Sequence, residues 1–169
     1  MTQELTPEMK SELKALVAKY EQPQSAMLPA LYIAQNKFGH LTDETLVSVA
    51  KELGVPPALA FEVVSFYTMF KREDKGRWFL QVCNNVTCTM MGSEDILKVI
   101  EEETGLKPGQ VAADKMFSVS CVQCLGSCDT APVVQVNDDY IEKLNPEKFR
   151  QFLRKLKTLP ANSNLLENN

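Results

Sequence analysis

No long apolar run and no excess of positive charge occur in this sequence. Its 169 residues carry 18 Lys and Arg against 22 Asp and Glu, which gives a formal net charge of -4. Such a chain has no basic field for nucleic acid, and no apolar run approaches the roughly 18 residues that a membrane-spanning helix requires. The start also lacks the basic residues and apolar stretch of a signal peptide. We therefore expect no nucleic-acid binding, no membrane insertion and a reducing compartment such as the cytosol.

Histidine is almost absent, and no glycine motif typical of nucleotide binding is present. The single histidine, His40, falls in a predicted turn between helices, which favours a surface role over catalysis. The composition is 44% hydrophobic, enough to bury a core. The five cysteines are therefore the main candidates for chemistry. In a reducing compartment they indicate metal ligands or redox groups rather than structural disulfides, and their odd number leaves one thiol outside any pairing.

The first part of the chain, residues 6 to 70, repeats its apolar residues at helical spacing, which predicts a small helical bundle. We expect the third helix to bury Leu46, Val47, Ala50 and Leu53. The boundaries of the four helices follow from cap and stop residues: Thr6 and Pro7 open the first, Ser25 caps the second and Gly39 ends it, Thr42 opens the third and Gly54 ends it, and Pro56 and Pro57 precede the fourth.

From Arg77 the pattern changes to strands mixed with helices. The predicted order is a strand at 77–83, a polar loop at 84–92, a helix capped by Ser93, a strand at 117–121, a hairpin turning at 137–139 and a last helix from Asn145. This order predicts one parallel crossover followed by an antiparallel hairpin. The expected fold class is thus α+β, with a helical bundle over 1–75, an α/β domain with a small mixed sheet over 76–159, and a disordered tail at 160–169.

Four of the cysteines follow the first two predicted strands in pairs. Cys83 and Cys88 form Cys-x4-Cys after the first strand, and Cys124 and Cys128 form Cys-x3-Cys after the second. If the two strands are neighbours, all four thiols meet at the carboxyl ends of the strands. Cys121 instead continues the apolar alternation of its strand, and we expect it to be a small buried hydrophobe.

Three kinds of site remain open on spacing alone. Zinc-binding pairs are usually short and matched, so Cys-x4-Cys is wide for a zinc-stabilised interaction module. A thioredoxin-like thiol oxidoreductase would use Cys121 and Cys124 as Cys-x-x-Cys, and Cys83 and Cys88 would then have no role. A 2Fe-2S cluster takes two thiolates on each iron and suits wider loops. Gly126 would let the backbone approach the sulfurs, so the spacing favours the cluster.

The cysteine pattern resembles that of a known family. Cys-x4-Cys, 35 intervening residues and Cys-x3-Cys within "CLGSCDTAPVVQVND" are similar to the small iron–sulfur subunit, also called the E subunit, of NADH:quinone oxidoreductase, respiratory complex I. The stretch "FGHLTDETLVSVAKELGVPPALAFEVVSFYTMF" resembles the helical region of that family, so the resemblance runs from about residue 10 to 157. It implies a thioredoxin-like 2Fe-2S ferredoxin domain over 76–159 and one cluster per chain. The implied ligands are Cys83, Cys88, Cys124 and Cys128, and Cys121 matches no family ligand.

The same resemblance implies a redox subunit of an NADH dehydrogenase that carries single electrons and has no catalysis of its own. Its expected partners are a flavoprotein subunit that binds FMN and NADH and further iron–sulfur subunits. The expected location is the peripheral arm of a membrane-associated complex, on the cytoplasmic side. Subunits of this type also serve NAD-linked hydrogenases and formate dehydrogenases, so such an assembly is the alternative.

Overall fold

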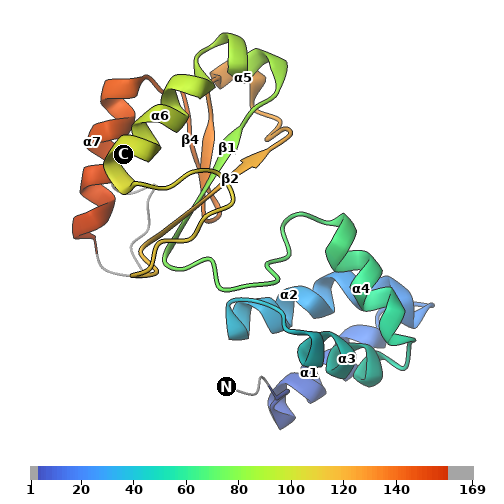
Figure 1. Ribbon diagram of the computed structural model, residues 1–169. Coiled ribbons are helices and arrows are strands. Elements are labelled where there is room, and N and C mark those ends of the chain that lie inside the picture. The colour runs from blue at the N-terminus through green and yellow to red at the C-terminus, as the bar shows by residue number, and fades with distance from the viewer. Residues whose placement is uncertain (1–3, 160–169) are drawn as a thin grey trace. The chain divides into compact units, whose positions relative to one another are not determined.

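The computed structural model describes residues 4–159 (Figure 1). These residues belong to two compact units that divide between Asp74 and Lys75. Each unit has its own hydrophobic core. Between residues 4 and 159, no helix has the length and apolar character needed to span a membrane. The tail at 160–169, which the sequence predicts to be disordered, lies outside the described residues.

The first unit is a helical bundle, as predicted. Its elements are α1 (Pro7–Val17), the 3-10 helix η1 (Pro23–Ala26), α2 (Met27–Phe38), α3 (Asp43–Leu53) and α4 (Pro57–Phe66). The threonine caps are confirmed, because the Thr6 and Thr42 hydroxyls accept hydrogen bonds from the backbone N–H groups of Met9 and Thr45, each at 3.3 Å. Gly54 ends α3 in the left-handed conformation.

Two predictions for this unit were wrong. Ser25 does not cap α2, because it lies inside η1, and the helical backbone of Ala26 leads from η1 directly into α2 without a side-chain cap. Val47 is 42% exposed rather than buried. The buried stripe of α3 is Leu46, Val49, Ala50 and Leu53, which leaves Val47 on the side of the helix that faces water.

The second unit contains a four-stranded mixed sheet in the order β2-β1-β3-β4. Strands β1 and β2 are parallel, whereas β1 with β3 and β3 with β4 are antiparallel, so the predicted crossover and hairpin are confirmed. The elements are β1 (Trp78–Cys83), α5 (Val86–Met90), α6 (Ser93–Thr104), β2 (Phe117–Val122), η2 (Cys128–Thr130), β3 (Val134–Val136), β4 (Asp139–Ile141) and α7 (Pro146–Thr158).

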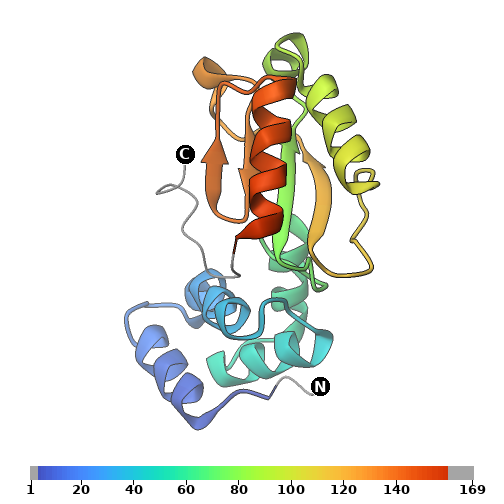
Figure 2. The same cartoon turned by 90° about the vertical axis from the view of Figure 1, so that its left-hand side faces the viewer.

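Helices α6 and α7 cover one face of this sheet (Figures 1 and 2). The core between the sheet and these two helices contains Trp78, Leu80 and Val82 of β1, Phe117 and Val119 of β2, Ile96 and Ile100 of α6, and Phe149, Leu153 and Leu156 of α7. The two helices are also joined by charge, because Glu103 of α6 pairs with Arg150 at 3.0 Å and with Arg154 at 2.8 Å.

Two local predictions in this unit were also wrong. The segment 84–92, predicted to be a loop, contains helix α5, whose first N–H group is held by the Asn85 side chain at 2.8 Å. Ser93 is the first residue of α6 and not its cap. Met91 and Gly92 join α5 to α6, and Gly92 adopts φ 98°, a backbone conformation that favours glycine.

The hairpin between β3 and β4 turns without glycine because Asn137 adopts φ 55°. Asparagine tolerates this left-handed conformation better than most residues. Both polar atoms of its side chain form hydrogen bonds. Oδ1 accepts from the N–H of Phe79 at 3.0 Å, and Nδ2 donates to the carbonyl of Arg77 at 3.1 Å. The turn is therefore tied to the start of β1.

Candidate metal centre

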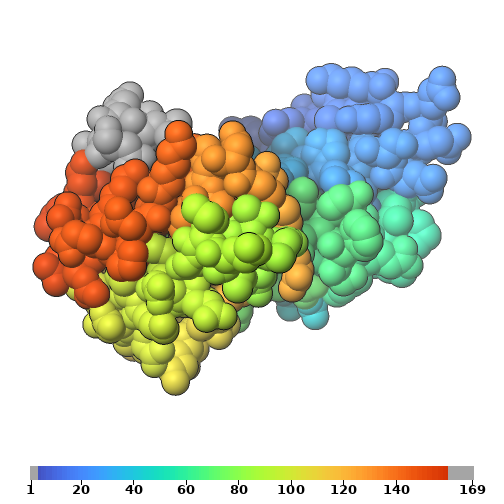
Figure 3. Space-filling model, turned by 90° about the horizontal axis from the view of Figure 1, so that it is seen from above, coloured from blue at the N-terminus to red at the C-terminus, as the bar shows by residue number. Residues whose placement is uncertain are grey.

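The parallel pairing of β1 with β2 brings the two cysteine loops to one edge of the sheet. Cys83 pairs in register with Val122, at the last positions of the two strands. The segment that leaves β1 there carries Cys88 on the short helix α5, and the segment that leaves β2 at the same end carries Cys124 and Cys128, the first residue of η2. Figure 3 looks down on this end, where the light green segment containing α5 lies against the orange segment containing η2.

The two cysteine pairs differ sharply in burial. Cys83 and Cys88 are 3% and 1% exposed, and they form a small apolar cluster with Val133 that Leu125 and Ala131 extend. Cys124 and Cys128 are both exposed. The first pair therefore forms the protein-facing wall of the candidate site, and the second pair forms its outer rim.

The thiol of Cys83 has several hydrogen-bond donors around it. Burial acts to raise its pKa. The backbone N–H groups of Asn85 and Leu125 outweigh that effect, with help from the thiols of Cys88 and Cys124, so the pKa of Cys83 lies below its ordinary value. This surrounding favours a thiolate at Cys83, the form that binds metals.

The thiol of Cys88 is affected in the opposite direction. Burial raises its pKa, and the backbone of Val133 offsets this only in part. The neighbouring thiols of Cys83 and Cys128 raise the pKa further. Cys83 thus interacts with Cys88 and Cys124, while Cys88 interacts with Cys83 and Cys128, so the four predicted ligands form one connected set.

Cys121 lies on the other side of the sheet from Cys83. It pairs in register with Val82, whose side chain belongs to the core face, and neighbouring positions of a strand point to opposite faces. The sequence predicts full burial, but Cys121 is half-buried. The other residues in the second half of β2 are half-buried too. Burial alone raises the pKa of its thiol, which disfavours the thiolate.

The residues of the set fit a cluster with two irons. Such a cluster needs two pairs of thiolates, which the two loops supply, and it gains from N–H groups directed at sulfur. The N–H group of Gly126 donates to Cys124 Sγ at 3.3 Å, and Gly126 reaches this position at φ 73°. Across residues 4–159, no three His, Cys, Asp or Glu side chains gather closely enough to hold a single metal ion.

The sequence did not point to three polar residues beside the rim. Ser127 and Thr130 lie in or just after the Cys-x3-Cys segment, and both hydroxyls donate to the carboxylate of Glu142. The serine and threonine could have been noticed from their position among the cysteines. Glu142 carries no such signal, because only the tertiary fold brings it to the loop.

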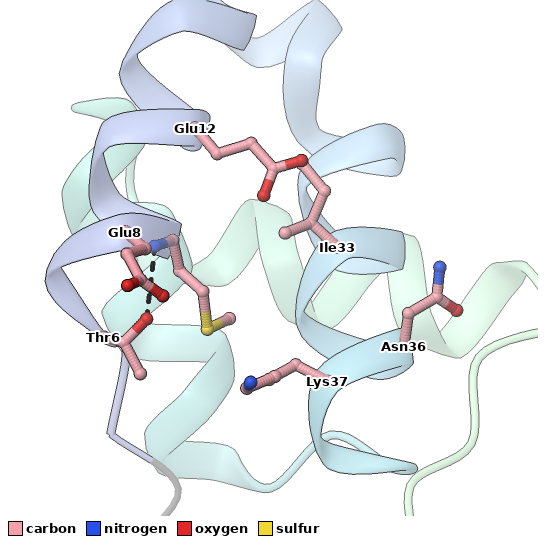
Figure 4. A pocket seen from close by; sticks show the side chains of 7 residues that line it. Thr6, Glu8, Glu12, Ile33, Asn36 and Lys37 are labelled. Carbon is pink, nitrogen blue, oxygen red and sulfur yellow. Dashed lines mark hydrogen bonds between the residues drawn. The ribbon is translucent and has the colours of Figure 1, made fainter.

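A hollow in the first unit offers no comparable chemistry. It measures about 370 Å³ and is lined by the α1 cap Thr6, by Glu8, Met9 and Glu12 of α1, and by Ile33, Asn36 and Lys37 of α2 (Figure 4). The Thr6 hydroxyl there already caps α1. His40 lies in the turn between α2 and α3, as predicted, and is not one of the lining residues.

Comparison with known proteins identifies close relatives. A model of the family described as thioredoxin-like [2Fe-2S] ferredoxin matches residues 13–157. An NADH-quinone oxidoreductase E subunit of Rhizobium meliloti (strain 1021), the one numbered 2, is 42% identical over 145 residues, 86% of each chain. The NADH-quinone oxidoreductase E subunit of Aquifex aeolicus (strain VF5) is 39% identical over 136 residues, 80% of this chain and 85% of that one.

The fold also resembles that of a solved structure. A chain of the NAD+-reducing [NiFe]-hydrogenase in its H2-reduced state superimposes with a TM-score of 0.71 over 83% of this chain, at 20% sequence identity. The present chain spans only 24% of that hydrogenase chain. At this identity the likeness concerns the fold, and together with the family match it confirms the predicted thioredoxin-like α+β class.

Proposed function

The chain belongs to the thioredoxin-like [2Fe-2S] ferredoxin family, and we propose that it is the electron-transfer E subunit of an NADH:quinone oxidoreductase. Its cofactor is a 2Fe-2S cluster. The observation that carries the proposal is the parallel register of β1 and β2, which brings the segments with all four predicted ligand thiols to one end of the sheet. Thiols gathered in this way can hold a metal cluster that passes electrons. We propose no catalysis by this chain alone.

Cys83, Cys88, Cys124 and Cys128 are the proposed ligands, two from the end of β1 and helix α5 and two from the segment after β2. When bound, the cluster accepts and releases one electron at a time. The chain contributes the surroundings: Cys83 and Cys88 fix one side in an apolar wall, and the N–H group of Gly126 offsets negative charge on Cys124. The exposed pair leaves the other side open toward a redox partner.

The names of the relatives as oxidoreductase subunits support a multi-subunit complex, within which we propose specific partners. As part of a multi-subunit complex, the chain would exchange electrons with a flavoprotein subunit that holds FMN and NADH, beside further iron–sulfur subunits. The proposed position is the peripheral arm of the complex, on the cytoplasmic side of the membrane.

An equivalent subunit of an NAD-linked hydrogenase is the second candidate, because the fold resembles a hydrogenase chain. That likeness rests on 20% identity, whereas the NADH-quinone oxidoreductase relatives are 39% to 42% identical over most of their length. Sequence similarity therefore favours the quinone-reducing assembly.

The function is tested by isolating a tagged chain from its native host under mild, low-salt conditions. We expect a visible iron–sulfur spectrum, iron with acid-labile sulfide, and co-purification with a flavoprotein and quinone-reducing membrane subunits. Co-purification with hydrogenase subunits would favour the second candidate. Stoichiometric zinc without sulfide in an anaerobic preparation would contradict the cluster, and recovery as a lone monomer would count against the complex.

A further inference from the structure

The exposed loop with Cys124 and Cys128 is held by hydrogen bonds from a segment later in the chain, residues 140–144. Tyr140 Oη donates to the carbonyl of Leu125 at 2.7 Å, and the N–H of Lys143 donates to the carbonyl of Thr130 at 2.8 Å. The N–H of Leu144 donates to the carbonyl of Pro132 at 3.3 Å. Leu125 and Ala131 anchor this loop to the apolar cluster of Cys83 and Cys88, and the hydrogen bonds hold the part with the exposed Cys124 and Cys128.

Glu142 brings a carboxylate to these contacts. Its Oε1 atom accepts from Ser127 Oγ at 2.5 Å and from Thr130 Oγ1 at 2.6 Å, and the two hydroxyls are themselves 2.6 Å apart. The hydrogen bonds from Ser127 and then Thr130 lower the pKa of Glu142, so the carboxylate is charged at neutral pH. Ser127 directly precedes Cys128, so this negative charge is bonded to a residue next to a proposed ligand.

We propose that Glu142 is a positioning residue that holds Ser127 and Thr130 in place around Cys128 and puts a fixed negative charge beside the cluster. The inference rests on the proposed function, in which Cys124 and Cys128 are ligands. A negative charge beside the cluster opposes the arrival of an electron, so Glu142 lowers the reduction potential of the cluster. It also restrains the side of the site that has the least protein around it.

The charge and the restraint can be separated by two substitutions. Glu142→Gln keeps an oxygen that accepts from the hydroxyls but removes the charge, whereas Glu142→Ala removes both. Glu147→Gln is the matched control, because Glu147 is an exposed residue of α7 whose side chain accepts a hydrogen bond from Gln151 at 2.8 Å, on the same helix. The same chemical change there leaves the cysteine loop untouched.

The experiment measures the midpoint potential of the cluster, its electron paramagnetic resonance spectrum and its rate of iron loss to a chelator, all in the full chain. We expect a more positive potential in Glu142→Gln than in wild type or Glu147→Gln, with little change in iron content. In Glu142→Ala we expect a more positive potential together with faster iron loss and an altered spectrum. Circular dichroism of the helices monitors folding.

An unchanged potential in Glu142→Gln overturns the proposal, even if Glu142→Ala loses iron, because a purely structural role leaves the potential in place. An equal shift in Glu147→Gln also overturns it, since the effect would then come from net charge. Failure of the proposed function is distinguishable, because wild-type protein would then contain no cluster at all.

Discussion

At the scale of single residues, the five cysteines have different surroundings although their spacing makes them look alike. Cys83 and Cys88 are buried, Cys124 and Cys128 are exposed, and Cys121 is half-buried on the opposite face of the sheet from Cys83. A serine oxygen is a harder and poorer ligand for iron than a thiolate. Single Cys→Ser substitutions therefore separate the proposed ligands from the bystander.

We predict that serine at position 83, 88, 124 or 128 greatly reduces iron and acid-labile sulfide per chain, whereas Cys121→Ser retains both. The cost at Cys121 is limited to packing and desolvation, about 1–3 kcal/mol if the hydroxyl finds no partner. The measurement is metal and sulfide analysis with the visible spectrum. Loss of the cluster in Cys121→Ser, with the cluster intact in Cys124→Ser, would reverse the assignment of these two residues.

Asn137 is a second residue whose role depends on its own chemistry. Asn137→Ala removes both hydrogen bonds to the start of β1 and places alanine at φ 55°, so we predict a loss of about 2–4 kcal/mol in the free energy of unfolding. Asn137→Gly keeps the backbone conformation accessible and loses only the side chain, and it should fall between alanine and wild type. Urea unfolding provides the values, and equal stability of the alanine variant and wild type would refute the role.

At the scale of elements, α6 and α7 are held together by apolar packing and by the carboxylate of Glu103. Hydrogen bonds from Arg154 and Arg150 lower the pKa of Glu103 to about 2. An unfolded glutamate has a pKa of roughly 4.3, so the stabilisation is fully present above that pH and is lost as the pH falls toward 2.

We predict that Glu103→Gln destabilises the chain at neutral pH and that its difference from wild type shrinks between about pH 4.5 and 2. The comparison uses metal-free chains, because iron–sulfur clusters do not survive acid and the core packed by α6 and α7 contains no cysteine. Glu101→Gln is the control, since Glu101 pairs with Lys107 on an exposed surface at 3.3 Å and should matter little. A pH-independent difference for Glu103→Gln would contradict the assigned ion pairs.

At the scale of the whole molecule, the chain consists of two units with separate cores, and all five cysteines belong to the second. Both units expose large apolar side chains, Phe66 at 76% in the first and Met90 at 81% in the second. Such side chains suit contacts with a partner subunit, and the second unit also holds the cofactor.

We predict that a chain lacking residues 1–74 still assembles its cluster but binds the proposed flavoprotein partner much more weakly. All proposed ligands and the whole sheet remain in that fragment. Iron and sulfide analysis checks the first part, and co-purification against the full chain checks the second. Full partner binding by the fragment would remove the proposed role of the helical unit, and loss of the cluster would mean that the two units depend on each other.

Features that depend on near neighbours in the chain could be predicted from the sequence. Helical spacing up to residue 70, alternation from Arg77, and the caps Thr6, Thr42 and Asn145 predicted the two kinds of structure and most of their boundaries. The spacing of four cysteines alone favours a 2Fe-2S cluster as the cofactor. These signals are local because helical hydrogen bonds and strand alternation act between residues close in the chain.

Only tertiary packing determines how deeply each cysteine is buried and which groups surround its thiol. The register of β1 against β2 places Cys83 and Cys121 on opposite faces, and a slip of one residue between the strands would put both on the same face. The approach of Glu142 to Ser127 and Thr130 depends on the position of β4 at the end of the sheet order. Such contacts join residues far apart in the chain, so packing of the whole sheet, and no local pattern, determines them.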